Sequence, residues 1–447
     1  QLVAVGSCSL KANTTGTESI AIGRAALQSN TTGSYNTAIG KAALCTNTTA
    51  NGNTAVGFNS LCANTTAADN TAVGYQALQD NTTGVRNVAL GKNALASNTT
   101  ADNSQAIGYN SLVNNTTGCQ NTSIGTSALQ ANTIGSNNMA IGISSLYSNT
   151  EGDNNVAIGC GALINNTTAN NNTAVGFRAM QLNVTGTCNV GIGSLALCKN
   201  TATANTAVGY AALCCNSSAS NNTAVGNKAL MVNTTGTQNV AVGSGALDSN
   251  TTAGCNTSIG QGSMGDNTEG ANNVAVGRTA LGSNTTGNSN VAIGRSSLTL
   301  NTTASGNAAV GAFALDQNTT GGCNTGLGWQ ALTANTTASH NTAVGALSLL
   351  ANTTGADNVA VGKDALLSNT TGNKNTAIGH SAMFTNVGAG HCNVAVGADA
   401  LYANTTAIQN TAVGFCSMRN TTIGSYNTAT GFFSLACNTT GISNVAI

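Results

Sequence analysis

Apolar and small residues return to the same positions along this chain with a 17-residue period. Twenty-six glycines mark the phase, from Gly6 to Gly431, and only two intervals differ: a 16-residue interval precedes Gly209 and an 18-residue interval precedes Gly397. A repeat this short and strict is typical of a unit that cannot fold alone and stacks on copies of itself. We therefore expect one continuous solenoid array over residues 1–447, as a segment of a longer fibre or a filament subunit.

The repeat has a fixed pattern, which we number as columns 1 to 17 from the asparagine four residues before each of these glycines. Column 1 is Asn in nearly every turn, column 3 is always small, column 4 is mostly Val or Ile, and column 5 is the glycine. Column 8 is Ala or Ser, and column 9 is Leu in 22 turns and Met in four. Column 12 is usually Asn, followed by Thr-Thr and then Gly or Ala. Residues 36–52 read NTAIGKAALCTNTTANG in this frame.

Charged residues show which columns face water. All 26 of them fall in columns 6, 7, 10, 11, 14, 16 or 17. An isolated charge is costly to bury, so the charge-free columns are expected inside. We expect columns 4 and 9 to form the apolar spine of each turn, while the small residues of columns 3 and 8 let two layers approach closely.

The repeat length favours β-structure, because helical repeats need about 30 residues or more. The segment N-T-A-[VI]-G is rich in β-branched residues and predicts one short strand, and A-L-x-x predicts a second. Glycine in column 5, and often in column 15, gives the backbone freedom that tight corners need. The chain contains no proline, which fits strands whose every N–H donates to a neighbouring turn. The predicted fold is an all-β parallel β-solenoid, or β-roll, of about 26 turns with two short strands per turn.

The asparagine columns have a structural interpretation. Identical Asn side chains on successive turns can form a hydrogen-bonded ladder, which we expect in column 1. Column 12 predicts a polar corner, in which Asn and Thr bond to the local backbone. Most of its Asn residues also lie in N-x-[ST] sequons, so some are candidate N-glycosylation sites. The first five complete examples after the opening turn are Asn30, Asn47, Asn64, Asn81 and Asn98.

Composition excludes several classes of protein. Only 6% of residues are charged, yet no apolar run reaches the ~20 residues of a membrane-spanning helix. The net charge is zero and basic residues are scattered, which argues against nucleic acid as a partner. No secretory or targeting segment is recognisable within these residues.

Fourteen cysteines do not form a conventional disulfide framework. Cys45 and Cys62 share column 10 on adjacent turns, as do Cys198 and Cys214. Neighbours in one column lie about 5 Å apart, which suits a disulfide along the stack. The remaining cysteines have no obvious partner in the same chain. This usage favours an oxidising, extracellular location.

Catalytic and metal-binding patterns are absent from the sequence. The three histidines, His340, His380 and His391, are scattered, and the acidic residues are single and occupy outer columns. No repeated pair of carboxylates is suited to acid–base catalysis, and no repeated Asp-containing glycine motif is suited to calcium. We expect no enzyme activity, no cofactor and no metal.

Two outer columns are candidates for contact with other molecules. Column 6 gathers aromatic residues such as Phe58, Tyr75 and Trp329 among basic ones; it either covers column 9 or forms a stripe for sugar or protein ligands. Column 2, uncharged and alternating between Thr and Val, is a candidate strip for lateral association. Since one turn buries only about two large aliphatic side chains, we expect association, with a trimer as the leading prediction.

The motif N-[TV]-A-[IV]-G-x-x-[AS]-[LM] resembles the YadA-type head repeat of trimeric autotransporter adhesins, and related repeats of phage and virus fibre proteins. The resemblance covers the whole chain. It implies a left-handed parallel β-roll, three chains around one axis, and a location on a cell or virion surface. Two features depart from that family: the turn is longer than usual, and the neck, stalk and membrane barrel are absent from these residues.

These observations predict a non-catalytic extracellular fibre that is structural or adhesive. Its main partner would be itself, as a homotrimer or an end-to-end filament, with host-surface glycans or proteins as further partners. A receptor-binding phage or virus tail fibre is one alternative. An ice-binding β-solenoid, using its threonine columns, is another.

Overall fold

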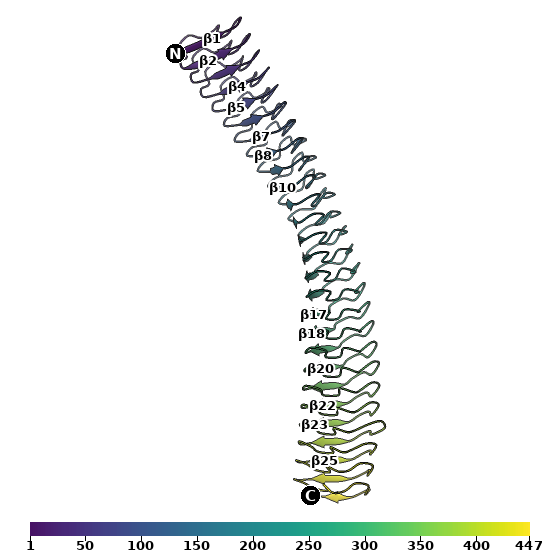
Figure 1. The fold of residues 1–447 in the computed structure, drawn as a ribbon. Coiled ribbons are helices and arrows are strands. Elements are labelled where there is room, and N and C mark those ends of the chain that lie inside the picture. The colour runs from purple at the N-terminus through teal and green to yellow at the C-terminus, as the bar shows by residue number, and fades with distance from the viewer. The chain divides into compact units, whose positions relative to one another are not determined.

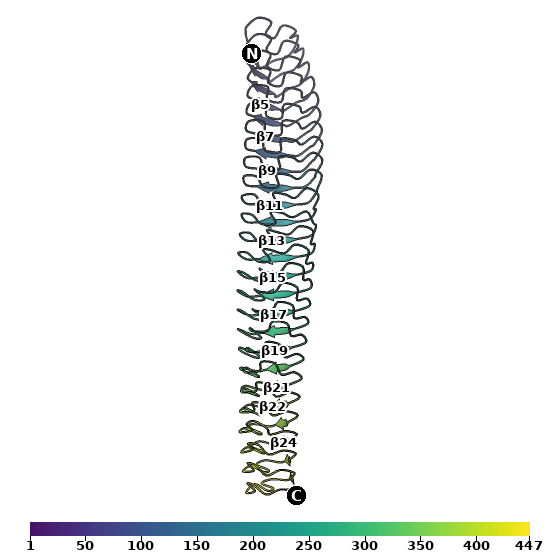
Figure 2. The ribbon, with the colours of Figure 1, turned by 90° about the vertical axis from the view of Figure 1, so that its right-hand side faces the viewer.

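A computed structural model describes residues 1–447. Contacts divide the chain into two units, residues 1–221 and 222–447, and the same repeat builds both. Each unit is a parallel β-solenoid in which every turn contributes one strand (Figures 1 and 2). The prediction of an all-β parallel solenoid with about 26 turns and a 17-residue period is confirmed.

The first unit contains thirteen strands, which are paired in parallel with the strand of the next turn. Their bounds are β1 Leu2–Val5, β2 Ser19–Ile22, β3 Thr37–Ile39, β4 Thr54–Val56, β5 Thr71–Val73, β6 Val88–Leu90, β7 Gln105–Ile107, β8 Thr122–Ile124, β9 Met139–Ile141, β10 Val156–Ile158, β11 Thr173–Val175, β12 Val190–Ile192 and β13 Thr206–Val208.

The second unit contains fourteen strands with the same parallel pairing. Their bounds are β14 Thr223–Val225, β15 Val240–Val242, β16 Thr257–Ile259, β17 Val274–Val276, β18 Val291–Ile293, β19 Ala308–Val310, β20 Thr325–Leu327, β21 Thr342–Val344, β22 Val359–Val361, β23 Thr376–Ile378, β24 Val394–Val396, β25 Thr411–Val413, β26 Thr428–Thr430 and β27 Val445–Ala446.

The prediction of two strands per turn is wrong, because the A-L-x-x segment is not extended. Residues in columns 7 and 9 take left-handed backbone angles, as in Ala42 with φ 56° and Leu44 with φ 52°. The segment still bonds to its neighbour, since Leu44 N donates to Ser60 O at 3.0 Å. Column 17 repeats the left-handed conformation just before each strand, for example in Tyr35 with φ 61°.

Column 4 does not form part of the core, which corrects a second prediction. A strand alternates its side chains, so the buried alanine of column 3 sends columns 2 and 4 outward. Ile39 keeps 38% of its surface exposed and Leu90 keeps 46%, whereas Ala38 between the outward positions is fully buried. The apolar interior therefore consists of the column 9 Leu or Met, such as Leu44, with the small residues of columns 3 and 8.

Buried asparagines supply the polar half of the interior. In column 12 of most turns the side-chain amide donates to the amide oxygen of the preceding turn, as from Asn47 Nδ2 to Asn30 Oδ1 at 2.8 Å. The same Nδ2 donates to the column 15 carbonyl of its own turn, here Ala50 O at 3.1 Å. These side chains are fully buried, so the ladder satisfies polar groups that have no access to water.

Column 1 bonds along the stack mainly through the backbone, rather than through the side-chain ladder we expected. The backbone N–H of Asn53 donates to Asn36 Oδ1 at 2.9 Å, and Asn53 Nδ2 donates to Ala67 O at 2.9 Å. Ala67 O also accepts from Asn64 Nδ2 at 2.9 Å. One column 15 carbonyl thus ties the two asparagine columns together.

Glycine is required in column 5 but not in column 15. Gly260 has φ 135°, and a Cβ there would overlap the carbonyl oxygen of Gly277 in the next turn. An L-residue is strained at that angle, and the clash is with backbone, so every turn keeps this glycine. Column 15 glycines such as Gly33 do not have positive φ, and Ala50 occupies the equivalent position.

Both irregular turns absorb their length change in the corner that follows column 12. Strands β12 and β13 pair in register across the 16-residue turn, and β23 and β24 do so across the 18-residue turn. In the short turn Asn200 Nδ2 bonds Ala202 O, two residues on, at 2.8 Å. The asparagine ladder continues through both turns.

The column 12 ladder is interrupted at Thr421, which replaces Asn and leaves Asn404 Oδ1 buried without a hydrogen-bond partner. We predict that Thr421→Asn restores a donor to Asn404 and stabilises the protein by about 1 kcal/mol. The measurement is the free energy of unfolding in urea. Thr440→Asn, which adds the same amide at an exposed position, is the matched control and should change nothing. Equal effects of the two substitutions would contradict the interpretation.

Candidate interaction surfaces

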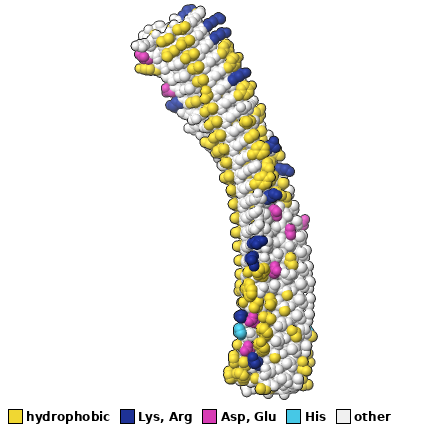
Figure 3. Space-filling view, viewed as in Figure 1, with side chains coloured by type: hydrophobic (Ala, Val, Ile, Leu, Met, Phe, Trp, Pro, Cys, Tyr) yellow, Lys and Arg dark blue, Asp and Glu magenta, His cyan; other side chains and the backbone are white.

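The outward side of the strands forms an uncharged face, which we call the sheet face and define as columns 2 and 4 of every turn. Column 2 is mostly Thr or Val and column 4 is mostly Val or Ile. Exposed members include Ile22 at 38%, Ile293 at 39% and Leu327 at 45%. Hydrophobic side chains recur in rows along parts of the visible surface (Figure 3). An exposed apolar area of this regularity is typical of a surface that meets another molecule.

Sequence reasoning placed only column 2 on this face and missed column 4. The signal was present in the repeat. Column 3 is small in every turn, which is the requirement for a residue that points into a narrow interior. The period-two alternation of a strand then turns both of its neighbours outward.

Column 6 forms the edge that follows the sheet face. Phe58 and Tyr75 stack with ring centroids 5.2 Å apart and planes 15° apart. Lys41 Nζ lies 5.2 Å from the Phe58 ring centroid, and Lys92 Nζ lies 5.6 Å from that of Tyr75. The faces of these rings are thus covered by a ring of the neighbouring turn and by lysine cations. Column 6 therefore presents the rims of its rings and its ammonium groups to a ligand.

Trp329, like Tyr210, is a column 6 aromatic without a stacked ring or a cation beside it. It is 52% exposed, and Ala312 and Ala346 hold the same column in the turns before and after it. The side chains of column 6 therefore differ in chemical type from one part of the chain to another. A single ligand that repeats along the whole chain is not indicated.

The candidate glycosylation sites lie inside the solenoid. The side chains of Asn30, Asn47, Asn64, Asn81 and Asn98 are fully buried. Each donates both Nδ2 hydrogens, one to the ladder and one to a column 15 carbonyl. A sugar on Nδ2 would replace one of these hydrogens and would need space that the interior lacks. Glycosylation stays a prediction from the sequence. A glycosylated asparagine would have to leave the hydrogen-bonded ladder.

The structure brings together both of the cysteine pairs expected from column 10. Cys45 Sγ and Cys62 Sγ lie 2.8 Å apart as two half-buried thiols. The thiols of Cys198 and Cys214 also lie close enough to interact, since Cys214 lowers the pKa of Cys198. Whether these pairs oxidise stays a prediction. Their proximity satisfies the geometric condition for a bond along the stack.

Sharing one proton separates the acidities of each pair. A hydrogen bond from Cys62 stabilises the Cys45 thiolate and lowers its pKa to about 7, while the same bond raises the pKa of Cys62. The Cys214 thiol lowers the pKa of Cys198 to about 7 in the same way. A thiolate at neutral pH is the form that attacks electrophiles and disulfides.

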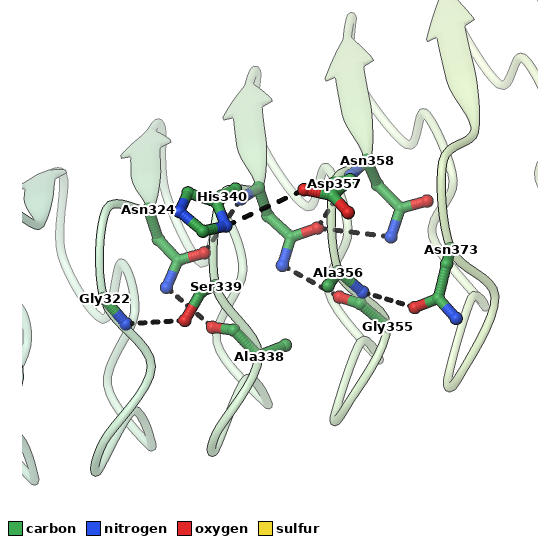
Figure 4. Close-up of polar contacts among 11 residues, drawn as sticks. Gly322, Asn324, Ala338, Ser339, His340, Gly355, Ala356, Asp357, Asn358 and Asn373 are labelled. Carbon is green, nitrogen blue, oxygen red and sulfur yellow. Dashed lines mark hydrogen bonds and ion pairs between the residues drawn. The ribbon is translucent and has the colours of Figure 1, made fainter.

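The histidines lie apart from one another and from any cluster of ligands. His340 Nδ1 lies 3.7 Å from Asp357 Oδ1 in the next turn (Figure 4). His391 Nδ1 accepts a hydrogen bond from Asn373 N at 2.9 Å. No group of three or more His, Cys, Asp or Glu side chains is placed to hold a metal ion. A hollow of about 250 Å³ beside His391 is lined also by Asn373, Lys374 and Cys392.

The contact of His391 belongs to a further capping pattern on the edge before the strands. Side chains of column 16 accept the backbone N–H of the preceding turn, as in Gly322 N to Ser339 Oγ at 3.0 Å and Ala356 N to Asn373 Oδ1 (Figure 4). His391 plays this part in the 18-residue turn. Its position is explained by turn stacking.

Nothing in the structure forms a helix of the length and apolar character that crossing a bilayer requires. Comparison with protein-family models and with curated proteins finds no match. The resemblance to YadA-type heads therefore rests on the repeat motif alone.

The lowered pKa of Cys45 predicts unusual reactivity in the reduced protein. Alkylation of Cys45 by iodoacetamide should rise with a midpoint near pH 7, because its thiolate forms above that pH. Cys416, whose pKa is raised by burial, is the internal control and should react slowly over the same range. Peptide mass spectrometry measures both rates. A Cys45 midpoint near 9, the ordinary value for a thiol, would contradict the shared-proton geometry.

Proposed function

We propose that this chain is a non-catalytic extracellular fibre module whose copies associate side by side through the sheet face. The observation that carries the proposal is the outward position of column 4. Branched aliphatic side chains are half-buried or exposed on turn after turn, flanked by uncharged column 2. Burying such side chains contributes about 25 cal/mol for each Å² removed from water.

Two features favour a second copy of the chain as the occupant of this face. Identical turns have identical spacing, so neighbouring copies can match every strand along their length. No charged residue lies in columns 1 to 5 of any turn, so like-charge repulsion does not oppose the contact.

The number of chains follows from the resemblance to YadA-type heads. That family assembles three chains around one axis, and we propose the same homotrimer here, built from left-handed β-rolls and located on a cell or virion surface. Columns 6, 7, 10, 11, 14 and 16 would remain on the outside. These are the columns with varied and charged side chains, and they would make the adhesive or receptor-binding contacts.

The same face is the basis of the ice-binding alternative, since column 2 carries many threonines. Column 4 decides between the two uses. It carries no hydroxyl in nearly every turn, and Val or Met replaces Thr in many turns of column 2. Self-association, which benefits from every one of these apolar groups, is therefore the function that the surface supports better.

Light scattering after size-exclusion chromatography tests the proposal. We predict a mass of three chains at micromolar concentration for the native protein. The triple variant Val276→Lys, Ile293→Lys and Val310→Lys places three charges on column 4 of adjacent turns and should shift the mass toward one chain. These side chains are already outward, so the far-UV circular dichroism should not change.

The matched control carries the same three charges on column 14 of the same turns, as Thr286→Lys, Thr303→Lys and Thr320→Lys. It should retain the native mass. A single-chain mass for the native protein, or an unchanged assembly in the column 4 variant, would contradict the proposal.

A further inference from the structure

A second, longer period is superimposed on the 17-residue repeat. Cysteines end the turn in column 17 at Cys188, Cys255, Cys323 and Cys392, with four turns from each to the next. Cys119 lies four turns before Cys188, one residue earlier in column 16. Five of the fourteen cysteines thus share one edge of the repeat at a constant interval.

The interval is constant in turns rather than in residues. The separations among the four column 17 cysteines are 67, 68 and 69 residues. The first interval contains the 16-residue turn and the last contains the 18-residue turn, and each still spans four turns. The period is therefore spatial: it follows the stacking of the solenoid.

The interior has the same four-turn period. Column 3 is Ala in every turn except four, where it is Ser123, Gly191, Ser258 or Gly326. Each of these exceptions lies in the strand that directly follows one of the first four cysteines. These column 3 residues change the contacts in the interior. A Cβ on Gly191 would lie 3.1 Å from Met180 Cγ, and Ser123 Oγ forms a hydrogen bond with Ser111 Oγ at 2.6 Å. The agreement of an inner and an outer column argues against a chance spacing of cysteines.

The four column 17 cysteines are held in equivalent positions. Their φ angles lie between 56° and 60°. Each backbone N–H donates to the column 16 carbonyl of the preceding turn, as from Cys255 to Thr237 O at 3.0 Å and from Cys323 to Ser305 O at 3.1 Å. His340 and Asp357, which occupy the same column in the two turns after Cys323, lie on this edge just before the strands (Figure 4).

Members of this set that lie in the same unit cannot pair with one another in the same chain. All four column 17 cysteines are exposed. Turns are stacked about 4.8 Å apart, so cysteines four turns apart within a unit are separated by roughly 19 Å. A disulfide requires Cα atoms within about 7 Å. Any disulfide between members of this set in the same unit must therefore join two molecules.

We propose that Cys119, Cys188, Cys255, Cys323 and Cys392 are cross-link sites through which one copy of this chain forms disulfide bonds with a second copy. The inference rests on the proposed lateral association. A second copy is the partner whose thiols have the same four-turn spacing, so one register brings several pairs together at once. Column 17 lies two residues before the strand begins, which places the thiols at the rim of the sheet face.

The oxidant is a low-molecular-weight disulfide such as oxidised glutathione. A cysteine thiolate of one copy attacks a glutathione sulfur, forms a mixed disulfide and releases one glutathione thiolate. The cysteine thiolate of the second copy then attacks the protein sulfur of that mixed disulfide. The interchain bond forms and a second glutathione thiolate leaves. Two protein thiols lose two protons and two electrons, and oxidised glutathione accepts the electrons.

Non-reducing denaturing electrophoresis after incubation with oxidised glutathione tests the inference. The native chain should give covalent species of two or more chains that disappear with a reductant. The variant with serine at Cys119, Cys188, Cys255, Cys323 and Cys392 should run as a single chain. The control variant, with serine at the exposed cysteines outside the set, Cys8, Cys160 and Cys437, should cross-link like the native chain.

A mixture of ¹⁵N-labelled and unlabelled copies identifies the bonds. Mass spectrometry should find disulfide-linked peptides that contain column 16 or 17 cysteines from one labelled and one unlabelled chain. Light scattering in reductant separates the two proposals. If the chains associate without forming these bonds, or if the five-serine variant cross-links as the native chain does, the inference is overturned and the proposed function stands. A single-chain mass in reductant would overturn both.

Discussion

Every other feature of this protein depends on hydrogen bonding in register between identical turns. The backbone bonds of the strands are only part of this. Two columns of buried asparagine connect each turn to the next, and both converge on the column 15 carbonyl. An amide that is buried without partners costs on the order of 1–3 kcal/mol, so a turn displaced from register would lose several bonds at once. This makes the stack specific as well as stable.

The narrow interior has a direct consequence for the surface. Alanine in column 3 and leucine in column 9 fill the space between the walls, and no room is left for a second layer of branched side chains. The Val and Ile of column 4 are therefore displaced to the outside, where they form the sheet face. The apolar surface available for association is thus a product of the same geometry that builds the core.

Periodicity was sufficient to predict the fold class and the number of turns, and charge placement was sufficient to predict that the charged columns face outward, because an unbroken repeat and its charges report directly on stacking. Periodicity did not predict the backbone conformation of the A-L-x-x segment, where we expected a second strand. Leu44 has left-handed angles that leucine rarely adopts alone, and only the bonds to the neighbouring turn hold it there. The direction of column 4 was missed because apolar character was taken as burial. The four-turn period of the cysteines was present in the sequence. It is recognisable only when the separations between cysteines are counted in turns, because the separations in residues vary.

The central claim, that the buried amide ladder holds the turns together, is tested most directly by removing one rung. Asn301 Nδ2 donates to Asn284 Oδ1 at 2.9 Å, and Asn301 Oδ1 accepts from Asn318 Nδ2 at 3.1 Å. Asn301→Ala leaves both neighbours with unpaired buried groups and should lower the free energy of unfolding in urea by about 2–4 kcal/mol. Asn227→Ala, at an exposed position, is the reference and should be nearly neutral. A loss at Asn301 no greater than at Asn227 would contradict the account.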